Sequence, residues 1–258
     1  MFSIIREILA RRNLISELVI KDLKIRYSRT ILGFLWVFLS PLFTVAIYYV
    51  VFSVILQVKI KEAPYLLYLM SAVFSWRFFH DSLLSSVTSL IYNKNLIKES
   101  NFPHYFIPLS IVLANGIIFL PSLAILIVTS LFYLKGLPIF ILFLPIILAI
   151  HLIVTIGISL MVSIINLKWR DIKYTLEAVL QISFYLTPVF YSLYLVKGSF
   201  PRFWFNMYIH NPLVGILSLY RLAILKGFYP LIKEEIGLSS LVIAPLGFAI
   251  AILLLSFY

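Results

Sequence analysis

The stretch ILGFLWVFLSPLFTVAIYYVVFSVIL, residues 31–56, contains no charged side chain. About 20 consecutive apolar residues are enough to cross the hydrocarbon core of a bilayer, so this stretch predicts a transmembrane helix. The composition extends that conclusion to the whole chain of 258 residues, of which 62% are hydrophobic and 12% charged. Soluble domains have roughly 45–50% apolar and about 25% charged residues. We therefore expect an integral membrane protein, which excludes a water-soluble enzyme, a disordered chain and a fibrous repeat.

The other apolar runs predict an all-α membrane protein with six transmembrane helices. The spans are expected near residues 31–56, 65–91, 105–134, 137–165, 174–196 and 239–258, and together they form one domain over residues 31–258. Pro108 and Pro121 are expected to kink the third span. Between the fifth and sixth spans, residues 213–225 are too few to cross and include Arg221, which favours a re-entrant or periplasmic helix. Prolines in this region indicate two short helices and a turn.

The first thirty residues differ from the rest because charged and apolar side chains alternate there. Ile8, Ile15, Val19 and Leu23 fall on one side of a helix with 3.6 residues per turn. Residues 1–30 therefore predict an amphipathic helix at the cytoplasmic membrane interface, with a break near Asn13. A cytosolic tail with incidental periodicity is the alternative.

Basic residues predict the orientation. The formal net charge is +11, and in a membrane protein such an excess reflects the positive-inside bias and headgroup contacts rather than nucleic acid. With the N-terminus inside, twelve Lys and Arg residues lie on the cytoplasmic side and eight on the other. Six spans then return the C-terminus to the cytoplasm.

The sequence offers no catalytic motif. It lacks a Gly-x-x-x-x-Gly-Lys-Ser/Thr phosphate loop, His-Glu-x-x-His and Gly-x-Ser-x-Gly, and it has no cysteine. The four histidines are scattered over separate segments. We therefore expect neither a metal site nor a cofactor in this chain, and any ATP must be bound elsewhere.

Ionisable residues inside predicted spans cost about 2.5–3.5 kcal/mol each at the bilayer centre. Arg77 and Asp81 are four residues apart and can neutralise each other on one helix face. They are either a pathway-facing pair that touches an anionic substrate or a structural ion pair near the outer interface, beside an aromatic belt of Trp76, Phe78 and Phe79. Glu177 is expected to pair with Lys173.

Aromatic side chains are the candidates for a substrate pathway. The C–H groups on the face of a sugar can stack on an aromatic ring. This kind of stacking does not depend on which sugar is present. The rings of interest on the first and fifth spans are Tyr48, Tyr49, Phe52, Phe184, Tyr185, Phe190, Tyr191 and Tyr194. Lipid-facing belts and ordinary packing are the alternative for each of them.

Four short patterns then occur in a familiar order. The residues from Arg26-Tyr27 through Leu32-Gly33 to Trp36, followed by Pro41, resemble the Arg-Tyr-x-x-Ser/Thr-x-Leu-Gly-x-x-Trp signature of type-2 ABC exporter permeases. Three later patterns match in sequence: Asn166 to Arg170-Asp171, Thr187-Pro188-Val189-Phe190-Tyr191, and Asn211-Pro212 followed by Tyr220-Arg221. The chain is most similar to the branch that moves O-antigen, capsular polysaccharide and teichoic acid, of which the Wzm-like membrane subunits are members.

The resemblance implies a homodimer in the bacterial inner membrane, bound to two subunits that hold ATP and Mg. A lipid-linked glycan would pass between the permeases along the rings of the first and fifth spans, and the later short helices, with Asn211, Pro212 and Arg221, would form an outer gate. The N-terminal helix and the loop over residues 92–104 would contact the ATPase. The coupling residues in that loop are Lys94, Lys98, Glu99 and Pro103.

Other residues of the resemblance are expected to have structural roles: Arg26, Tyr27, Gly33, Trp36, Arg170 and Asp171. Arg170 and Asp171 would hold the fourth and fifth spans together, either as a local pair or with Asp171 capping the fifth helix. Two other functions stay open: a permease for drugs, haem or lipids, and a membrane-embedded transferase.

Overall fold

A computed structural model describes residues 2–27, 31–60, 63–99, 102–136, 138–231, 242–248 and 250–251. This part of the chain is helical and contains no strand. Three helices are long and apolar enough to cross a membrane, at Gly33–Ile55, Phe106–Leu134 and Ile139–Lys168. The predicted all-α class is thus confirmed, while six spans stay a prediction. In the predicted sixth span, only residues 242–248 and 250–251 are described, and they are helical.

The helices follow one another with short connections. In chain order they are α1 Phe2–Ala10, α2 Arg12–Tyr27, η1 Gly33–Leu35, α3 Trp36–Tyr49, η2 Val50–Ile55, α4 Tyr65–Val87, α5 Ser89–Tyr92, α6 Lys94–Glu99, α7 Phe106–Leu134, η3 Ile139–Phe143, α8 Leu144–Lys168, α9 Ile172–Leu186, α10 Leu193–Ser199, α11 Arg202–Ile209, α12 Pro212–Ile224 and α13 Phe228–Leu231. Of these, η2 is a π-helix, and η1 and η3 are 3₁₀-helices.

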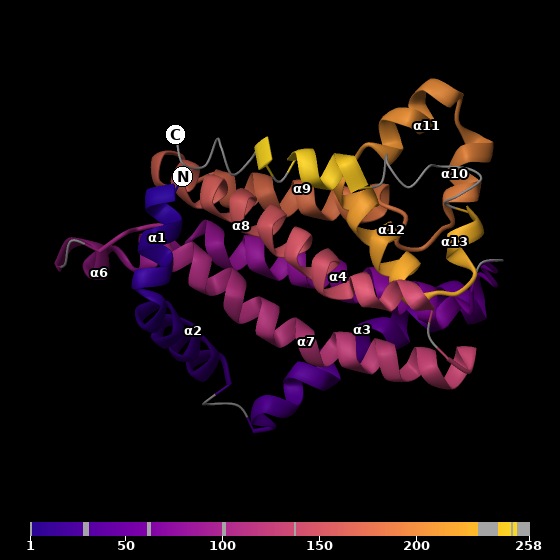
Figure 1. Cartoon of the computed structure of the whole chain (residues 1–258), viewed down its shortest axis with the longest axis horizontal. Coiled ribbons are helices and arrows are strands. Elements are labelled where there is room, and N and C mark those ends of the chain that lie inside the picture. The colour runs from indigo at the N-terminus through magenta and orange to yellow at the C-terminus, as the bar shows by residue number, and fades with distance from the viewer. Residues whose placement is uncertain are drawn as a thin grey trace.

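Helix α4 is the centre of the bundle. It is buried along most of its length and contacts α3, α7, α8, α9 and α12. Figure 1 shows α4, α7 and α8 running beside one another along the long axis of the molecule. Helices α1 and α6 lie at one end, and α10, α11 and α13 lie at the other. The N-terminal helix α1 and the short helices α10, α11 and α13 therefore lie at opposite ends of the molecule.

The N-terminal segment forms two helices, α1 and α2, which meet at Arg11, two residues before Asn13, where the break is expected. The apolar face of α2 is covered by protein, since Ile15 and Val19 are buried against Phe106 and Leu109 at the start of α7. The predicted amphipathic pattern thus serves helix packing.

The start of the first span depends on a glycine. Gly33 has a φ of +49°, in the left-handed region that is strained for residues with a Cβ atom. The turn that it makes leads through η1 into α3. Residues 28–30 of the first pattern lie outside the described residues. The positive φ angle at this position thus explains why the pattern has a glycine there.

The region after residue 174 differs from the predicted continuous fifth helix. Helix α9 ends at Leu186, residues 187–192 are not helical, and α10 follows. Fifteen residues at 1.5 Å each give α9 a length of about 22 Å, less than the roughly 30 Å hydrocarbon core. The apolar run over residues 174–196 predicted one continuous helix, because hydropathy does not indicate where a helix ends.

The segment over residues 197–238 contains more helix than the predicted two short helices and a turn. The end of α10 and the helices α11, α12 and α13 all fall within it. Helix α12 is buried from Val214 to Ile224 and contacts α4 and α8, so it enters the bundle without crossing it.

Candidate functional site

A cleft of about 670 Å³ opens between α3, α4 and α9. The lining residues recur every three or four positions along each helix, so each helix presents one face to the cleft. These residues are Ser40, Thr44 and Tyr48 on α3, Val73, Trp76, Arg77, His80, Asp81 and Leu84 on α4, and Glu177, Leu180, Gln181, Phe184 and Tyr185 on α9. Polar side chains gather at one end of the cleft and rings at the other.

The ring end joins α3 to α9. The ring centroids of Tyr48 and Phe184 lie 5.8 Å apart, and Phe190 packs edge-on to both, at 5.0 Å from Tyr48 and 5.1 Å from Phe184. Phe52 stacks on Phe190 at 4.3 Å. Trp76 of α4 completes the cluster, 5.5 Å from Phe184. Such offset and edge-to-face pairs hold rings in fixed positions.

The remaining candidate rings lie apart from this cluster or at its edge. Tyr185 is exposed in the cleft and contacts Phe184 and Phe190. Tyr49 is half-buried against the core. Tyr191 turns away, and its hydroxyl contacts the carbonyl oxygen of Leu186 at 2.9 Å and the Tyr208 hydroxyl at 3.2 Å. Tyr194, on α10, is exposed.

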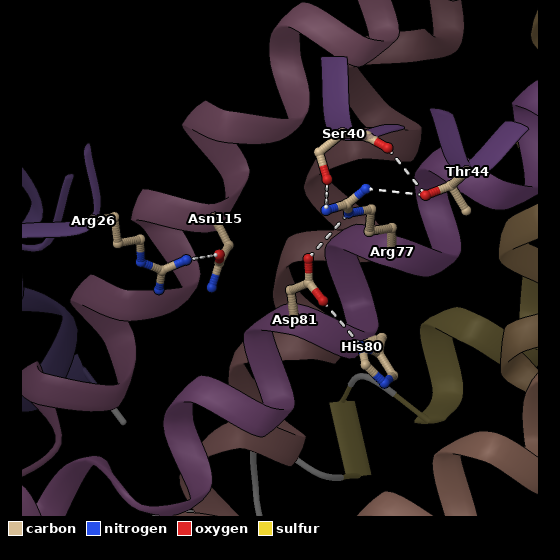
Figure 2. A network of polar contacts seen from close by, with 7 residues as sticks. All are labelled: Arg26, Ser40, Thr44, Arg77, His80, Asp81 and Asn115. Carbon is tan, nitrogen blue, oxygen red and sulfur yellow. Dashed lines mark hydrogen bonds and ion pairs between the residues drawn. The ribbon is translucent and has the colours of Figure 1, made fainter. Parts of the chain in front are cut away.

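The polar end is organised around Arg77, as Figure 2 shows. Its guanidinium donates to Ser40 Oγ at 2.6 Å and to Thr44 Oγ1 at 3.4 Å, and its Nε lies 3.3 Å from Asp81 Oδ2. The second carboxylate oxygen, Asp81 Oδ1, lies 3.0 Å from His80 Nδ1. The network therefore joins α3 to α4.

The ion pair between Arg77 and Asp81 thus exists, but an aromatic belt does not surround it. Trp76, Phe78 and Phe79 are only 6%, 4% and 3% exposed. They pack within the bundle, so the predicted outer belt is wrong. The expected pairing of Glu177 with Lys173 is absent from the ion pairs of the described residues.

A second, smaller cavity of about 80 Å³ lies on the other side of Arg77, between α2, α3, α4 and α7. Its lining includes Arg26, Tyr27 and Trp36 of the first sequence pattern. Arg26 donates to Asn115 Oδ1 at 2.7 Å, and its Nε lies 2.9 Å from Asp22 Oδ2. The pattern therefore docks the end of α2 onto α7 and onto the start of the first span.

Beyond the ring end, buried side chains hold the non-helical segment after α9. Arg221 is completely buried, stacks on the Tyr68 ring at 3.5 Å and donates to the Val189 carbonyl at 3.3 Å. The hydroxyls of Tyr65 and Tyr68 donate to the next two carbonyls, those of Phe190 and Tyr191, at 3.2 and 2.8 Å. Irregular backbone at membrane depth is tolerated where protein satisfies it, and these three donors do so.

The Asn211-Pro212 pattern is the start of α12. Asn211 Oδ1 accepts from the backbone N–H of Leu213 at 2.9 Å, and Pro212 occupies the first helical position, where a missing N–H costs nothing. These two residues thus set where the buried helix begins. Arg221 lies about two and a half turns after Pro212 on the same helix, inside the bundle.

At the opposite end, the loop over residues 92–104 contains α6. Leu96 and Ile97 of α6, with Phe102, pack against Leu90 and Ile107. Lys94 is exposed, and the carbonyl of Pro103 accepts from Phe106 at the start of α7. The side chains of Lys98 and Glu99 lie outside the described residues. The loop helix is therefore joined to α5 and α7 by apolar contacts.

The turn between α8 and α9 is held differently from the prediction. Asp171 occupies the N-cap position of α9, but its side chain makes no capping hydrogen bond, and no ion pair to Arg170 occurs in the described part of the chain. Instead, the buried side chain of Asn166 donates to the Val87 carbonyl at 2.8 Å and ties α8 to α4. Asn166 is in the same pattern, but spacing alone did not identify its partner.

No group of three His, Asp or Glu residues that could hold a metal ion occurs in the part of the chain that the structure describes. The polar and aromatic cleft residues that the sequence did not place at a functional site are Ser40, Thr44, Trp76, His80 and Gln181. Positions 73, 76, 77, 80, 81 and 84 form one helical stripe, which was the available signal. Only the fold shows that this stripe faces α3 and α9.

Three helices that are long and apolar enough to cross a membrane indicate a helical membrane protein. No protein-family model matches the chain. It is 33% identical over 216 residues to an O-antigen export system permease protein RfbA of Klebsiella pneumoniae, covering 80% of this chain and 78% of that protein. A protein of the same description from Myxococcus xanthus is 27% identical over 221 residues, which cover 86% and 84% of the two chains. The chain belongs to the O-antigen export permease family.

Proposed function

We propose that this chain is the membrane-spanning permease subunit of an ATP-driven exporter. Its substrate is a lipid-linked, O-antigen-like polysaccharide, which moves from the cytoplasm to the outer side of the bacterial inner membrane. The observation that carries this proposal is the similarity to O-antigen export permeases over 80% of the chain. The ring cluster of α3, α4 and α9 supports it, because aromatic faces bind successive sugars weakly and without fixed hydrogen-bond partners.

The proposed pathway follows the rings that the sequence indicated, Tyr48, Tyr49, Phe52, Phe184, Tyr185, Phe190 and Tyr191. Of these, Tyr48, Phe184 and Tyr185 line the cleft. A long polymer must bind weakly at many places, because one tight site would stall it. The segment held by Arg221 and the start of α12 at Asn211-Pro212 form the outer gate. A second copy of the chain completes the pathway, so the working unit is a homodimer.

Energy comes from two partner subunits that bind ATP and Mg, since this sequence has no phosphate loop. They dock at the end of the molecule where α1 and α6 lie, with Lys94, Lys98, Glu99 and Pro103 in the contact. This end faces the cytoplasm, as do both termini of a six-span chain. The permease itself carries out no chemistry.

Co-purification tests this proposal. The tagged permease, expressed with the proposed ATP-binding subunit, is expected to yield a complex whose ATPase rate rises when lipid-linked O-antigen is added. A permease that purifies alone, or a complex that responds to haem or drugs and not to lipid-linked glycan, would contradict the assignment.

A further inference from the structure

The cleft between α3, α4 and α9 is graded from polar to aromatic along all three helices. On α3, Ser40 and Thr44 precede Tyr48, and on α9, Glu177 and Gln181 precede Phe184. Helix α4 runs in the opposite direction, and its order is reversed, with Trp76 before Arg77 and Asp81. The polar halves therefore coincide at the end of the cleft nearer the α8–α9 turn. In the proposed orientation this is the cytoplasmic end.

One wall of the polar end is already fixed. Arg77 is held by Ser40, Thr44 and Asp81, and Asp81 also contacts His80. These contacts position a carboxylate and an imidazole at the cleft surface without a ligand. Preorganised polar groups bind a ligand at lower entropic cost.

The opposite wall presents side chains without partners. Glu177 and Gln181 lie one turn apart on α9, and both line the cleft. Among the described residues, neither side chain takes part in a hydrogen bond or ion pair. Both residues are exposed, so the carboxylate and the amide are open to hydrogen bonds with a ligand that enters the cleft.

The balance of charge narrows the class of ligand. Two carboxylates, Asp81 and Glu177, face one guanidinium, that of Arg77, which is already shared among three oxygens. An anionic group, such as a phosphate or a uronate, would meet more negative than positive charge here. Hydroxyl groups both donate and accept, so they can satisfy carboxylates, an amide and a guanidinium together.

We propose that the polar end of the cleft is a binding site for an uncharged sugar, with Asp81, Glu177 and Gln181 as its hydrogen-bonding residues and His80 and Arg77 as their neighbours. This inference rests on the proposed function and adds to it a step at the cytoplasmic end. Sugars are first held there by hydrogen bonds and then pass to the rings of Tyr48, Trp76 and Phe184. Selection among glycans occurs at this polar end, because stacking on rings does not discriminate.

The first test is binding. The permease–ATPase complex is placed in nanodiscs without glycoside detergent, and saturation-transfer NMR is recorded with a neutral trisaccharide, mannotriose, and with trigalacturonate. We expect transfer to mannotriose and none to trigalacturonate. Gln181→Ala and Glu177→Gln should each weaken mannotriose binding about fivefold, as expected for one lost hydrogen bond. Thr175→Ala, on the same helix but outside the cleft, is the matched control.

The second test is export in cells that lack the native permease gene. The Glu177→Gln/Gln181→Ala variant is expected to reduce surface polysaccharide several-fold, while Thr175→Ala restores it fully. If the wild type itself does not restore export, the proposed function fails. If the wild type restores export and the double variant does so equally, the sugar site is wrong. Absence of mannotriose binding to the wild-type complex, or equal binding of trigalacturonate, also overturns it. Should the double variant not fold, surface polysaccharide is measured with Gln181→Ala alone, and export equal to that of the wild type would again contradict the sugar site.

Discussion

Arg221 of α12 is a fully buried cation, and its contacts with α4 and with the segment after α9 explain how its charge is accommodated. Its guanidinium carbon lies 3.5 Å from the centre of the Tyr68 ring, and the guanidinium also donates to the Val189 carbonyl in the segment after α9. Lysine cannot reproduce this geometry, because an ammonium group is neither planar nor forked. The residue thus fixes the non-helical segment rather than providing charge alone.

Arg221→Lys is therefore expected to destabilise the permease by about 2 kcal/mol, the size of a desolvated cation–π contact, and to lower its melting temperature by roughly 5 °C. Fluorescence-detected gel filtration after heating in detergent measures this. Arg202→Lys, at an exposed position on α11, is the control and should leave the melting temperature unchanged. Equal stability of both variants would mean that the stacking contributes nothing.

Asp22 gives a dependence on pH. It is half-buried on α2, and burial raises the pKa of its carboxyl group although the Arg26 charge beside it opposes the shift. A raised folded-state pKa favours the protonated form, so its contribution to stability is present at low pH and is lost as the pH rises through the folded-state pKa. Asparagine does not ionise. We therefore expect the Asp22→Asn variant to be more stable to unfolding than the wild type at pH 7, and no more stable than the wild type below pH 4.

Thermal unfolding of the wild type and of Asp22→Asn across this pH range measures the difference. Glu17→Gln, at an exposed position on the same helix, should not change with pH in this way. A wild-type protein that is more stable than Asp22→Asn at pH 7 would show that the pair with Arg26 outweighs burial.

At the scale of elements, the sequence predicted where helices lie along the chain better than it predicted which helices and side chains contact one another. Uncharged runs indicated the helices at Gly33–Ile55 and Phe106–Leu134, because apolar length is a property of one segment. The break at Thr187 was missed, because it depends on donors from Arg221, Tyr65 and Tyr68, which are distant in sequence. The rings on α3 and α9 could be proposed from their chemistry, whereas only the fold shows that Trp76 and His80 of α4 share their cleft.

Helix α6 allows a test of coupling. Leu96 and Ile97 join it to α5 and α7 through apolar contacts, which would make it a rigid lever. Replacing both by Ala should reduce export several-fold while the complex still assembles and hydrolyses ATP, because the loop would move without moving α7. Asn95→Ala, at an exposed position on the same helix, is the control. Normal export per ATP hydrolysed in the double variant would exclude α6 as the coupling element.

At the scale of the whole molecule, the two ends have different helices and different expected surroundings. Since the chain has no cysteine, single cysteines report topology directly. Cysteine at position 198, in α10, is expected to react with an impermeant maleimide from the periplasm, whereas cysteine at position 98, in α6, should react only after the inner membrane is opened. Labelling at 98 but not at 198 in intact spheroplasts would invert the proposed orientation.

The central claim is that this chain carries lipid-linked O-antigen across the membrane, and export by a defined complex tests it most directly. The permease and its ATPase are reconstituted into vesicles that contain a lipid-linked O-antigen, and the glycan on the non-ATPase side is measured with an impermeant glycosidase or lectin. We predict that the glycan becomes accessible only with ATP and Mg, and that a catalytically inactive ATPase abolishes the signal. A glycan that stays protected in vesicles with active, folded complex would contradict the account.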